Sequence, residues 1–429
     1  MKKDLKIKVH EITRVEGHGN IVIDVKKGEI KELKLEIIES PRFFEMMLRG
    51  RRYDEAQHIM SRICGICAVS HTSASLKAIE SAMGINISRQ ATLLRKLAFD
   101  GEMLQSHILH LFFLVLPDLV GAGSIVPLLS SHPEMAKTGL ELKRLANEIC
   151  GVVGGRHIHP ISLFPGGVLF TPKADDLKKL RDGLEASFSG LDAALEILKT
   201  KPAPNFSLER EFISLKQKGE YSFYDGEPVS SENYSFKSEN YTKKIKEYVV
   251  PHSSAKHSKT ANGTFMVGAL ARINNNFRQL KSRARAASIA GGLKPVSYNP
   301  FMNNLAQLVE CYHATEDAIN LIDKLLEIGP KPEPLKKPKT HGRGVGIVEA
   351  PRGTLYHEYV INKDGLIEKA NCIIPTAQNL RSIEDDLRAL VPTMLDRPKA
   401  EISKAVETLV RAYDPCISCS THIMDVSFI

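Results

Sequence analysis

The sequence has no long hydrophobic run and no dense block of one charge. Its purely apolar stretches, such as residues 111–116, fall far short of the roughly 20 residues that a transmembrane helix needs. The charged start, residues 1–6, has no apolar core of a signal peptide. Lysine and arginine exceed aspartate and glutamate by only 58 to 50 over 429 residues, without interleaved aromatics. We therefore expect a cytoplasmic protein with no membrane span and no nucleic-acid partner.

Three further features are absent. No internal repeat is visible, and the composition, 43% hydrophobic and 25% charged, is unlike that of disordered chains, collagens or coiled coils. No Gly-x-Gly-x-x-Gly fingerprint follows a strand pattern, so NAD(P) or flavin chemistry is not expected on this chain.

Hydrophobic periodicity predicts an α+β fold that is mainly helical, with a central bundle of long helices. Small β pieces are expected near the N-terminus and after residue 345. In chain order, we expect a β hairpin within 1–40, a helical body at 52–328, an extended linker at 329–344, a second hairpin at 353–375, a C-terminal helix with a cysteine pair at 400–422 and a tail at 423–429.

Within the helical body, the apolar spacing from Arg89 onward predicts a long, mostly buried helix that ends at Pro117. Residues 174–200 and 303–328 predict two more helices. Residues 201–240 are rich in Ser, Tyr, Asn and Lys with little periodicity, which predicts a surface excursion.

Four of the seven cysteines form two Cys-x-x-Cys pairs, Cys64/Cys67 and Cys416/Cys419. A thioredoxin-like redox pair would follow the first strand of a βαβ unit, which neither pair does, and a zinc ribbon has its pairs much closer together. A shared site would have to be assembled by the whole fold, which favours one interwoven domain over several. Four thiolates suit zinc, iron–sulfur clusters, nickel or copper(I). The remaining cysteines are expected to be buried thiols: Cys150, Cys311 and Cys372.

The residues flanking both pairs resemble the large (catalytic) subunit of nickel–iron hydrogenases. Five motifs carry the resemblance, in the family's order: Arg14-Val-Glu-Gly-His18, residues 62–71 (RICGICAVSH), Glu349-Ala-Pro-Arg-Gly353, residues 374–379 (IPTAQN) and residues 414–422 (DPCISCSTH). The compact length and the segments 41–45 and 252–257 look most like the cytoplasmic, cofactor-linked group. That group includes sulfhydrogenases linked to NAD(P) and enzymes coupled to heterodisulfide reductase.

The resemblance implies reversible, heterolytic cleavage of hydrogen at a nickel–iron centre. It implies that Cys64 and Cys416 bind nickel terminally, while Cys67 and Cys419 bridge nickel to an iron that carries carbon monoxide and cyanide. It also implies a magnesium-type ion, Mg²⁺ or Fe²⁺. Its ligands would be Glu45, His422 and a backbone carbonyl near Cys372.

Within these motifs, Glu16 is the candidate proton acceptor, because a carboxylate beside a metal thiolate can move protons. Arg14 is expected to orient that segment. Arg352 would place a fixed positive charge over the metal pair and hold a cyanide. Thr376 would offer a hydroxyl to a second cyanide.

Other residues are expected to surround the centre. His71 is predicted to donate a hydrogen bond to a bridging sulfur, and Asp414 is predicted to pair with Arg352 or a neighbouring donor. An apolar wall around carbon monoxide is expected from Pro351, Leu355 and Ile374.

Two histidine pairs leave their interpretation open. His107 with His110, and His252 with His257, could line a proton route or a subunit contact, and are equally compatible with the core or the surface. Ser106 departs from the aspartate that many respiratory members carry directly before the histidine equivalent to His107.

Iron–sulfur clusters are not expected on this chain, because three scattered cysteines are too few to hold one. The resemblance implies an iron–sulfur small subunit, further flavin- or NAD(P)-binding or other electron-transfer subunits, nickel-insertion proteins and a maturation endopeptidase that removes residues 423–429.

Two alternatives stay open from sequence. One is a non-catalytic protein whose four cysteines hold zinc. The other is the related quinone-site subunit of respiratory complex I, which has lost the thiolates that this chain retains.

Overall fold

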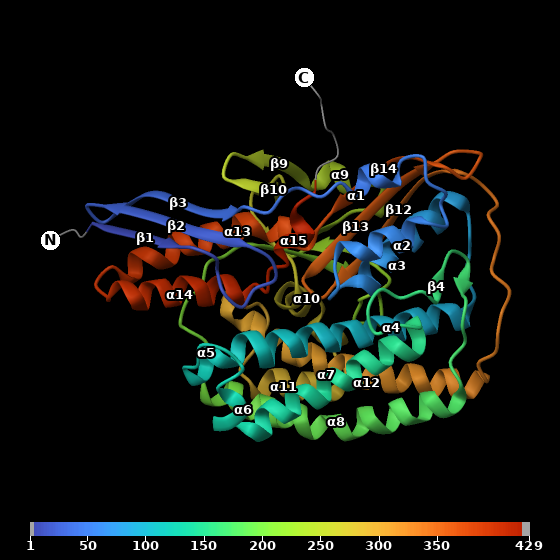
Figure 1. Ribbon diagram of the computed structural model, residues 1–429, viewed down its shortest axis with the longest axis horizontal. Helices are drawn as coiled ribbons and strands as arrows, with labels where there is room; N and C mark the ends of the chain where they lie inside the picture. The colour runs from blue at the N-terminus through green and yellow to red at the C-terminus, as the bar shows by residue number, and fades with distance from the viewer. Residues whose placement is uncertain (1–3, 423–429) are drawn as a thin grey trace.

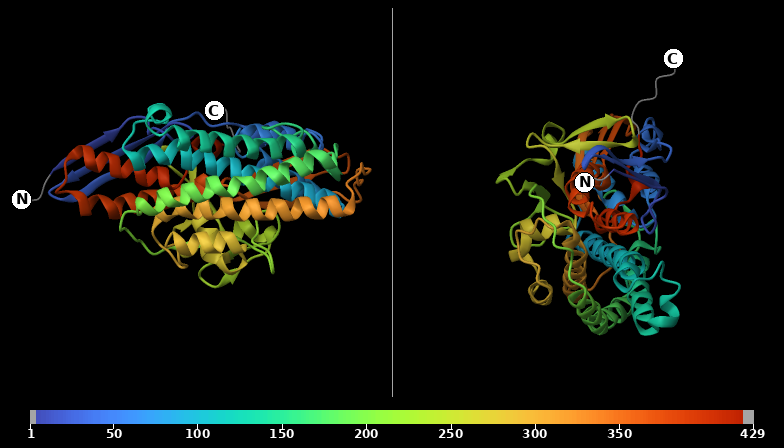
Figure 2. Two further views of the ribbon diagram at one scale, coloured as in Figure 1. Left: turned by 90° about the horizontal axis from the view of Figure 1, so that it is seen from below. Right: turned by 90° about the vertical axis from the view of Figure 1, so that its left-hand side faces the viewer.

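The computed structural model describes residues 4–422, so the predicted cleaved tail at 423–429 lies outside the described residues. The fold is α+β and mainly helical, as predicted (Figure 1). Long helices form one layer, and the largest sheet with the helices near the C-terminal end of the described chain lies in the other (Figure 2).

The helical layer is a bundle in which each of four long helices packs on two others. Its members are α4 (Arg89–Ile108), α7 (Pro133–Gly154), α8 (Ala174–Thr200) and α12 (Asn303–Ile328). The helices predicted at 174–200 and 303–328 are confirmed. Ser88 begins α4 by accepting a hydrogen bond from Ala91 N at 3.0 Å, which satisfies one of the free N–H groups of the first turn.

Pro117 does not end the long helix, contrary to the prediction. After α4 the chain widens into a π-helix, Leu109–Val115, and continues as α5, Leu116–Val120. The proline lies in the first turn of α5, where the wider turn before it accommodates a residue without an N–H. Gly121, at φ 73°, ends the helix instead.

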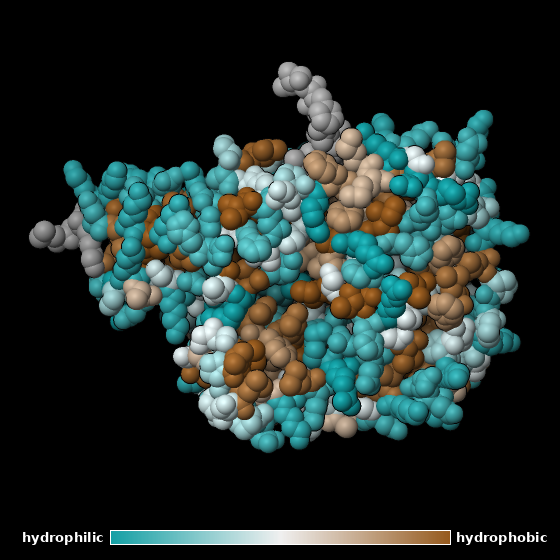
Figure 3. All heavy atoms as spheres, viewed as in Figure 1, coloured by the Kyte–Doolittle hydropathy of each residue, from teal (hydrophilic) through white to brown (hydrophobic). Residues whose placement is uncertain are grey.

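Within residues 4–422, the continuous segment Arg89–Val120 is the one helix whose length and composition would allow it to span a membrane. In the most apolar 18-residue stretch of this segment, 67% is buried inside the fold. This burial is typical of a helix in the core of the protein. On the face shown in Figure 3, apolar side chains are interspersed with hydrophilic ones.

The largest sheet joins segments that are distant in sequence, in the order β1-β2-β3-β10-β9. Its strands are β1 (Leu5–Val9), β2 (Gly19–Lys26), β3 (Glu29–Ile37), β9 (Lys246–Val250) and β10 (Ser253–Lys259). Helix α13 (Pro375–Leu390) packs on β3 and β10, and α14 (Lys399–Ala412) packs near β1. The C-terminal segment is thereby held against the N-terminal hairpin (Figure 1).

A three-stranded sheet of β12 (Gly342–Ala350), β13 (Gly353–Ile361) and β14 (Ile367–Ile373) packs on α3 (Ala68–Met83). The second hairpin is confirmed, but β12 is a third strand that begins inside the predicted linker. Its Gly346 lies against α3 so closely that a Cβ would be 2.0 Å from Ala74 O. Only glycine permits this contact between strand and helix.

The predicted surface excursion at 201–240 is wrong in part. It contains β6 (Glu211–Lys216), which is buried over five of its six residues and lies in the sheet β11-β6-β7-β8. The remaining elements are β4 (Leu163–Phe164), β5 (Gly167–Val168), β7 (Glu227–Ser230), β8 (Tyr234–Ser235), β11 (Phe265–Met266), α1 (Phe44–Leu48), α2 (Ala56–Met60), α6 (Leu128–Ser131), α9 (Tyr241–Lys244), α10 (Ala269–Asn276), α11 (Ser282–Ala290), α15 (Ile417–Ser420) and short 3₁₀ turns.

Candidate metal centre

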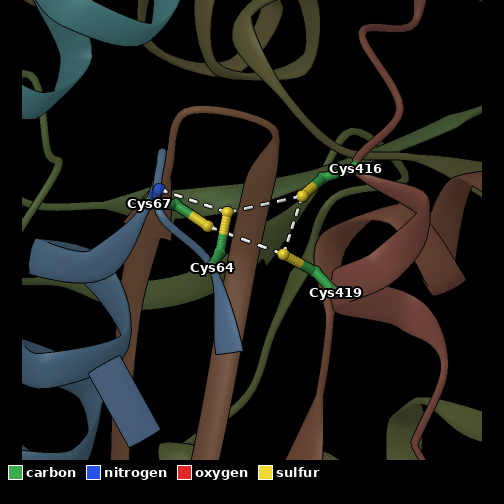
Figure 4. Close-up of side chains that lie close together, drawn as sticks. All are labelled: Cys64, Cys67, Cys416 and Cys419. Atoms are coloured by element: carbon green, nitrogen blue, oxygen red, sulfur yellow. Dashed lines mark hydrogen bonds between the residues drawn. The ribbon is translucent and has the colours of Figure 1, made fainter. Parts of the chain in front are cut away.

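The two cysteine pairs meet in one buried cluster, although some 350 residues separate them in sequence. The Sγ atoms of Cys64 and Cys416 are 3.6 Å apart, and those of Cys67 and Cys419 are 3.8 Å apart. All four sulfurs lie within 4.8 Å of one another, and all four thiols are free (Figure 4). The fold therefore assembles the shared four-cysteine site, as the sequence predicts.

The second pair is positioned by the N-terminal segment and by α13. Ile417 N donates to Glu16 O at 2.9 Å, which pairs the Arg14-Val-Glu-Gly-His18 segment with the second cysteine pair. Cys416 N donates to Thr376 Oγ1, also at 2.9 Å, in the first turn of α13. The Thr376 hydroxyl thus positions the backbone of a metal-ligand candidate.

The first pair is held by α4. Gln105 Nε2 donates to Ile66 O, between the two cysteines, at 2.9 Å. Glu102, fully buried, accepts hydrogen bonds from Val69 N at 2.5 Å and Ser70 N at 2.9 Å, in the first turn of α3. The N-cap residue of this helix, Cys67, forms no side-chain hydrogen bond to the first turn. Glu102 therefore supplies the acceptors from another helix.

Replacing Glu102 with alanine is expected to lower the free energy of unfolding by about 1–3 kcal/mol, because it leaves buried N–H groups of α3 without acceptors. Urea unfolding followed by circular dichroism measures the change. Glu141→Ala, at an exposed position of α7, is the control. An equal decrease in the free energy of unfolding in the two variants would contradict the capping role of Glu102.

The four cysteine sulfurs need a bound cation to be stable as thiolates. Hydrogen bonding to Cys416 lowers the pKa of the Cys64 thiol, whereas burial raises the pKa of Cys416 well above its usual range and that of Cys419 to about 11. By itself the cluster cannot hold four thiolates, since only positive charge would stabilise them in a buried site. Four soft sulfurs fit nickel, iron or zinc, so the residues present are compatible with a nickel–iron centre.

Arg352, in the turn between β12 and β13, lies beside the cluster. Its Nη2 donates to Asp414 Oδ1 at 2.9 Å and its Nε to Asp414 O at 2.7 Å, so the predicted pairing of these two residues is confirmed. A small cavity is lined by Arg352 together with three of the four cysteines. Its lining consists of Cys67, His71, Ala350, Arg352, Ile374, Pro375, Thr376, Cys416 and Cys419.

The three residues predicted to form an apolar wall differ in their position relative to this cavity. Ile374 lines this cavity. Pro351 and Leu355 are buried in the β12–β13 hairpin but are not among the lining residues, whose apolar members also include Ala350 and Pro375. Side chains alternate between the faces of a strand, so nearness in sequence to Arg352 does not bring Leu355 to the cavity.

A second buried arginine supports the turn that carries Arg352. Arg272, in α10, donates to Ala350 O and Pro351 O at 2.9 Å each. Its charge is balanced by Glu310, with Nε–Oε1 at 2.6 Å, and by Glu349 at 2.9 Å. All three charged side chains are fully buried. Sequence reasoning missed this arrangement, because single charged residues on three elements show no spacing pattern.

Replacing Glu310 with glutamine is expected to lower the free energy of unfolding by about 3–5 kcal/mol at pH 7, because a buried charge loses its partner. Burial alone would raise the pKa of Glu310, but Arg272 lowers it to about 2. The carboxylate therefore stabilises the fold above its ordinary pKa near 4.5, and this contribution is lost as the pH falls toward 2.

Urea unfolding over a pH series tests this expectation. The difference in the free energy of unfolding between wild type and Glu310→Gln should decrease as the pH falls below about 4.5. Glu327→Gln, exposed on the same helix, should track the wild type. A gap that is independent of pH would contradict the assignment.

Glu16 lies beside the second cysteine pair. Its partly buried carboxylate accepts a hydrogen bond from Ser418 N at 3.1 Å, between Cys416 and Cys419 in sequence. Arg14 forms an ion pair with Asp118 and donates to Leu114 O at 2.7 Å. Arg14 thus anchors the segment that carries Glu16 to the long helix, consistent with the expected orienting role.

A second small cavity adjoins the cluster. It is lined by Glu45, Cys372, Cys419 and His422, among others. Glu45 Oε1 and His422 Nδ1 lie 2.5 Å apart, and within the described chain neither side chain has a hydrogen-bond partner. Two buried, unsatisfied ligand groups that face each other fit a bound cation between them.

His71 lines the cavity beside Cys67, but its observed partner is another histidine. Its Nδ1 is 3.2 Å from His357 Nε2, and His357 Nδ1 is 2.8 Å from Tyr359 Oη. Burial lowers the pKa of His71 to about 4, so the ring is neutral near pH 7. Sequence analysis missed His357, since a single histidine in a strand carries no signal.

The remaining candidates are located away from the sulfurs. His107 pairs with Glu310 at 2.8 Å and His110 with Gln307 at 2.5 Å, so both are buried polar residues of the core. Ser106 Oγ accepts from Arg352 Nη1 at 3.5 Å. His252 directly precedes β10 and His257 lies on it, and α13 packs on this strand of the largest sheet. The predicted buried thiols are confirmed at Cys150, Cys311 and Cys372.

Comparison with known proteins decides the family. The family model described as nickel-dependent hydrogenase matches residues 42–138 and 207–422, and one described as HoxL-like matches residues 6–40. The chain belongs to the nickel-dependent hydrogenase family. It is the large subunit of such an enzyme, which acts on hydrogen. The four-cysteine cluster and the family together support hydrogen oxidation at a nickel–iron centre, over the zinc and complex I alternatives.

The hydrogenase has relatives that match almost its whole length. It is 35% identical to the alpha chain of sulfhydrogenase 1 from Pyrococcus furiosus, covering 98% of each chain. It is 30% identical to a chain of the F420-non-reducing hydrogenase from Methanothermobacter marburgensis, over 98% of this chain and 95% of that one. The structure of an NAD⁺-reducing [NiFe]-hydrogenase matches with a TM-score of 0.90 at 28% identity, covering 97% and 99% of the chains.

Proposed function

We propose that this chain, folded as one interwoven domain, catalyses the reversible heterolytic cleavage of molecular hydrogen into protons and electrons. The observation that carries the proposal is the buried cluster of four cysteine sulfurs, within 4.8 Å of one another, beside the Arg352 guanidinium. When bound, a nickel–iron centre would supply the Lewis acidity and the redox change that cleavage requires. The chain supplies ligands, positive charge and a route for protons.

The two cysteines of each pair have different assigned roles. Cys64 and Cys416 would bind nickel alone, and Cys67 and Cys419 would bridge it to iron. Carbon monoxide and cyanide on the iron would occupy the small cavity lined by Ile374, Thr376 and Arg352. Arg352 would offer N–H donors to one cyanide, and the Thr376 hydroxyl, which accepts from Cys416 N, would offer its proton to the other.

Glu16 is the proposed proton acceptor. Its carboxylate lies over the backbone between Cys416 and Cys419 and is partly exposed. A group that contacts the ligand loop on one side and solvent on the other can take a proton at the centre and release it outside. His71 is proposed to orient the Cys67 side of the centre through its pairing with His357.

Glu45, His422 and the backbone at Cys372 are proposed to hold Mg²⁺ or Fe²⁺ in the second cavity. Replacing Glu45 with glutamine is expected to lower the content of this ion by about one per chain, because the amide removes the charged oxygen ligand. Elemental analysis of the purified enzyme measures it. Glu368→Gln, exposed on β14 near Cys372, is the control. Unchanged magnesium and excess iron in Glu45→Gln would contradict the site.

Electrons are proposed to leave over the first cysteine pair. Gly65 is exposed next to buried Cys64, and a Cβ there would lie 3.9 Å from Ile158, which is 47% exposed. Exposed backbone this close to the ligands would allow an iron–sulfur small subunit to approach the centre. Further flavin- or NAD(P)-binding subunits, or other electron carriers, would extend the chain of transfer, and nickel-insertion proteins and an endopeptidase would mature the enzyme. We place the complex in the cytoplasm.

The test is hydrogen-dependent reduction of benzyl viologen by the anaerobically purified complex. We expect dye reduction under hydrogen, and hydrogen evolution when the dye is supplied reduced. A complex with its full content of nickel that neither consumes nor produces hydrogen would overturn the proposed function.

A further inference from the structure

A second group of metal-ligand side chains lies outside the cysteine cluster. His252 stands in the turn before β10, His257 lies on β10, and Glu384 lies on α13, which packs on that strand (Figure 1). One ring nitrogen of each histidine and one carboxylate oxygen lie within 4.8 Å of one another. His252 Nε2 is 2.7 Å from Glu384 Oε1.

His257 is the unusual member of this group. Its side chain is fully buried, yet neither ring nitrogen has a hydrogen-bond partner among residues 4–422. The surrounding rings do not satisfy it, because Tyr248 and His252 contact it edge-on, each with its centroid 5.8 Å away. Buried polar groups are nearly always paired. An unsatisfied imidazole that faces a histidine and a carboxylate therefore points to a missing ligand.

We propose that His252, His257 and Glu384 bind a divalent transition-metal ion of the zinc type. Two imidazoles and one carboxylate form a three-ligand zinc set that leaves one position for water. That position can open outward, because His252 is 17% exposed at its side chain, whereas Glu384 and His257 are buried.

Glu384 supplies negative charge to the group, and Arg381 partly offsets it. Arg381 Nη1 is 3.8 Å from Glu384 Oε2, the oxygen opposite the one that His252 contacts. Oε1 accepts its other hydrogen bond from Leu35 N at 3.1 Å. The arginine thus orients the carboxylate and leaves Oε1 facing the two rings.

The ion would link β10 to α13, because it would share ligands from both elements. The same helix carries Thr376 in its first turn, where the hydroxyl holds Cys416 N. A metal at Glu384 would therefore fix the helix that positions the second cysteine pair. The site is structural in this assignment, and it is separate from the nickel ligands.

The test uses the hydrogenase purified with its copurifying subunits, treated with a chelator and titrated with Co²⁺. Cobalt bound to imidazole and carboxylate gives visible d–d bands, whereas cobalt on the cysteines would add a near-ultraviolet thiolate charge-transfer band. We expect one Co²⁺ per chain without that band, displaced by Zn²⁺. Absence of such a signal in the wild type would overturn the proposal.

Two variants sharpen the assignment. His257→Ala should weaken cobalt binding by more than about 100-fold, since even an outer-shell partner is worth about 10- to 100-fold in metal affinity. Glu384→Gln keeps the shape of the side chain and should also weaken cobalt binding. This variant tests the site even if His257→Ala fails to fold. His132→Ala removes an exposed histidine and should bind as the wild type. Equal affinity in Glu384→Gln and wild type would refute this ligand set. Nickel content and dye reduction report separately on the proposed function.

Discussion

Replacing Cys419 with serine is expected to lower hydrogen-dependent dye reduction by at least about a thousandfold, together with loss of nickel and iron. Its sulfur lies 2.7 Å from Cys416 Sγ and 3.8 Å from Cys67 Sγ, at the junction of the two pairs. A serine hydroxyl is a hard ligand that does not ionise near neutral pH, so it cannot replace a bridging thiolate.

Metal analysis and dye reduction on the same preparation measure this effect. Cys311→Ala is the matched control, because Cys311 is a buried free thiol on α12 that takes no part in the cluster. Its nickel content should equal that of the wild type. Retention of full nickel and activity in Cys419→Ser would contradict the ligand assignment.

Replacing Glu16 with glutamine is expected to lower turnover by about 10²- to 10⁴-fold, the usual contribution of a positioned acid–base group. Nickel and iron should stay bound, because the amide oxygen can still accept the hydrogen bond from Ser418 N. The loss is therefore one of proton transfer rather than of assembly.

Turnover is measured by dye reduction, and proton transfer is measured by exchange between D₂ gas and water. Both should fall together in Glu16→Gln at unchanged metal content. Glu11→Gln, exposed upstream in the same segment, should behave as the wild type. An exchange rate equal to that of the wild type would assign the proton to another group.

The helical part of the fold was predictable because its signal is local. Helices 174–200 and 303–328 carry apolar residues at helical spacing over seven turns, and the structure places them at those limits. Strand β6 escaped prediction because it is six residues long, within a polar stretch. The end of the long helix was misplaced at Pro117, because a π-turn that accommodates proline depends on packing rather than on composition.

The site was predictable only where a motif supplied it. The cysteine pairs and the Glu16, Arg352 and Asp414 segments are recognisable in the sequence, and the structure brings them together. Glu102 and Arg272 gave no signal, since each is an ordinary charged residue whose partners come from other helices or strands. Their roles arise from tertiary contacts that no local pattern records.

The central claim is that the four buried cysteines hold a nickel–iron centre. The most direct measurement is metal content together with an infrared spectrum of the purified chain and its copurified partners. We expect about one nickel per chain, one iron beyond the partners' clusters, and absorption bands of carbon monoxide and cyanide. Zinc in the cysteine site without nickel, or a spectrum without those bands in fully matured protein, would contradict the account.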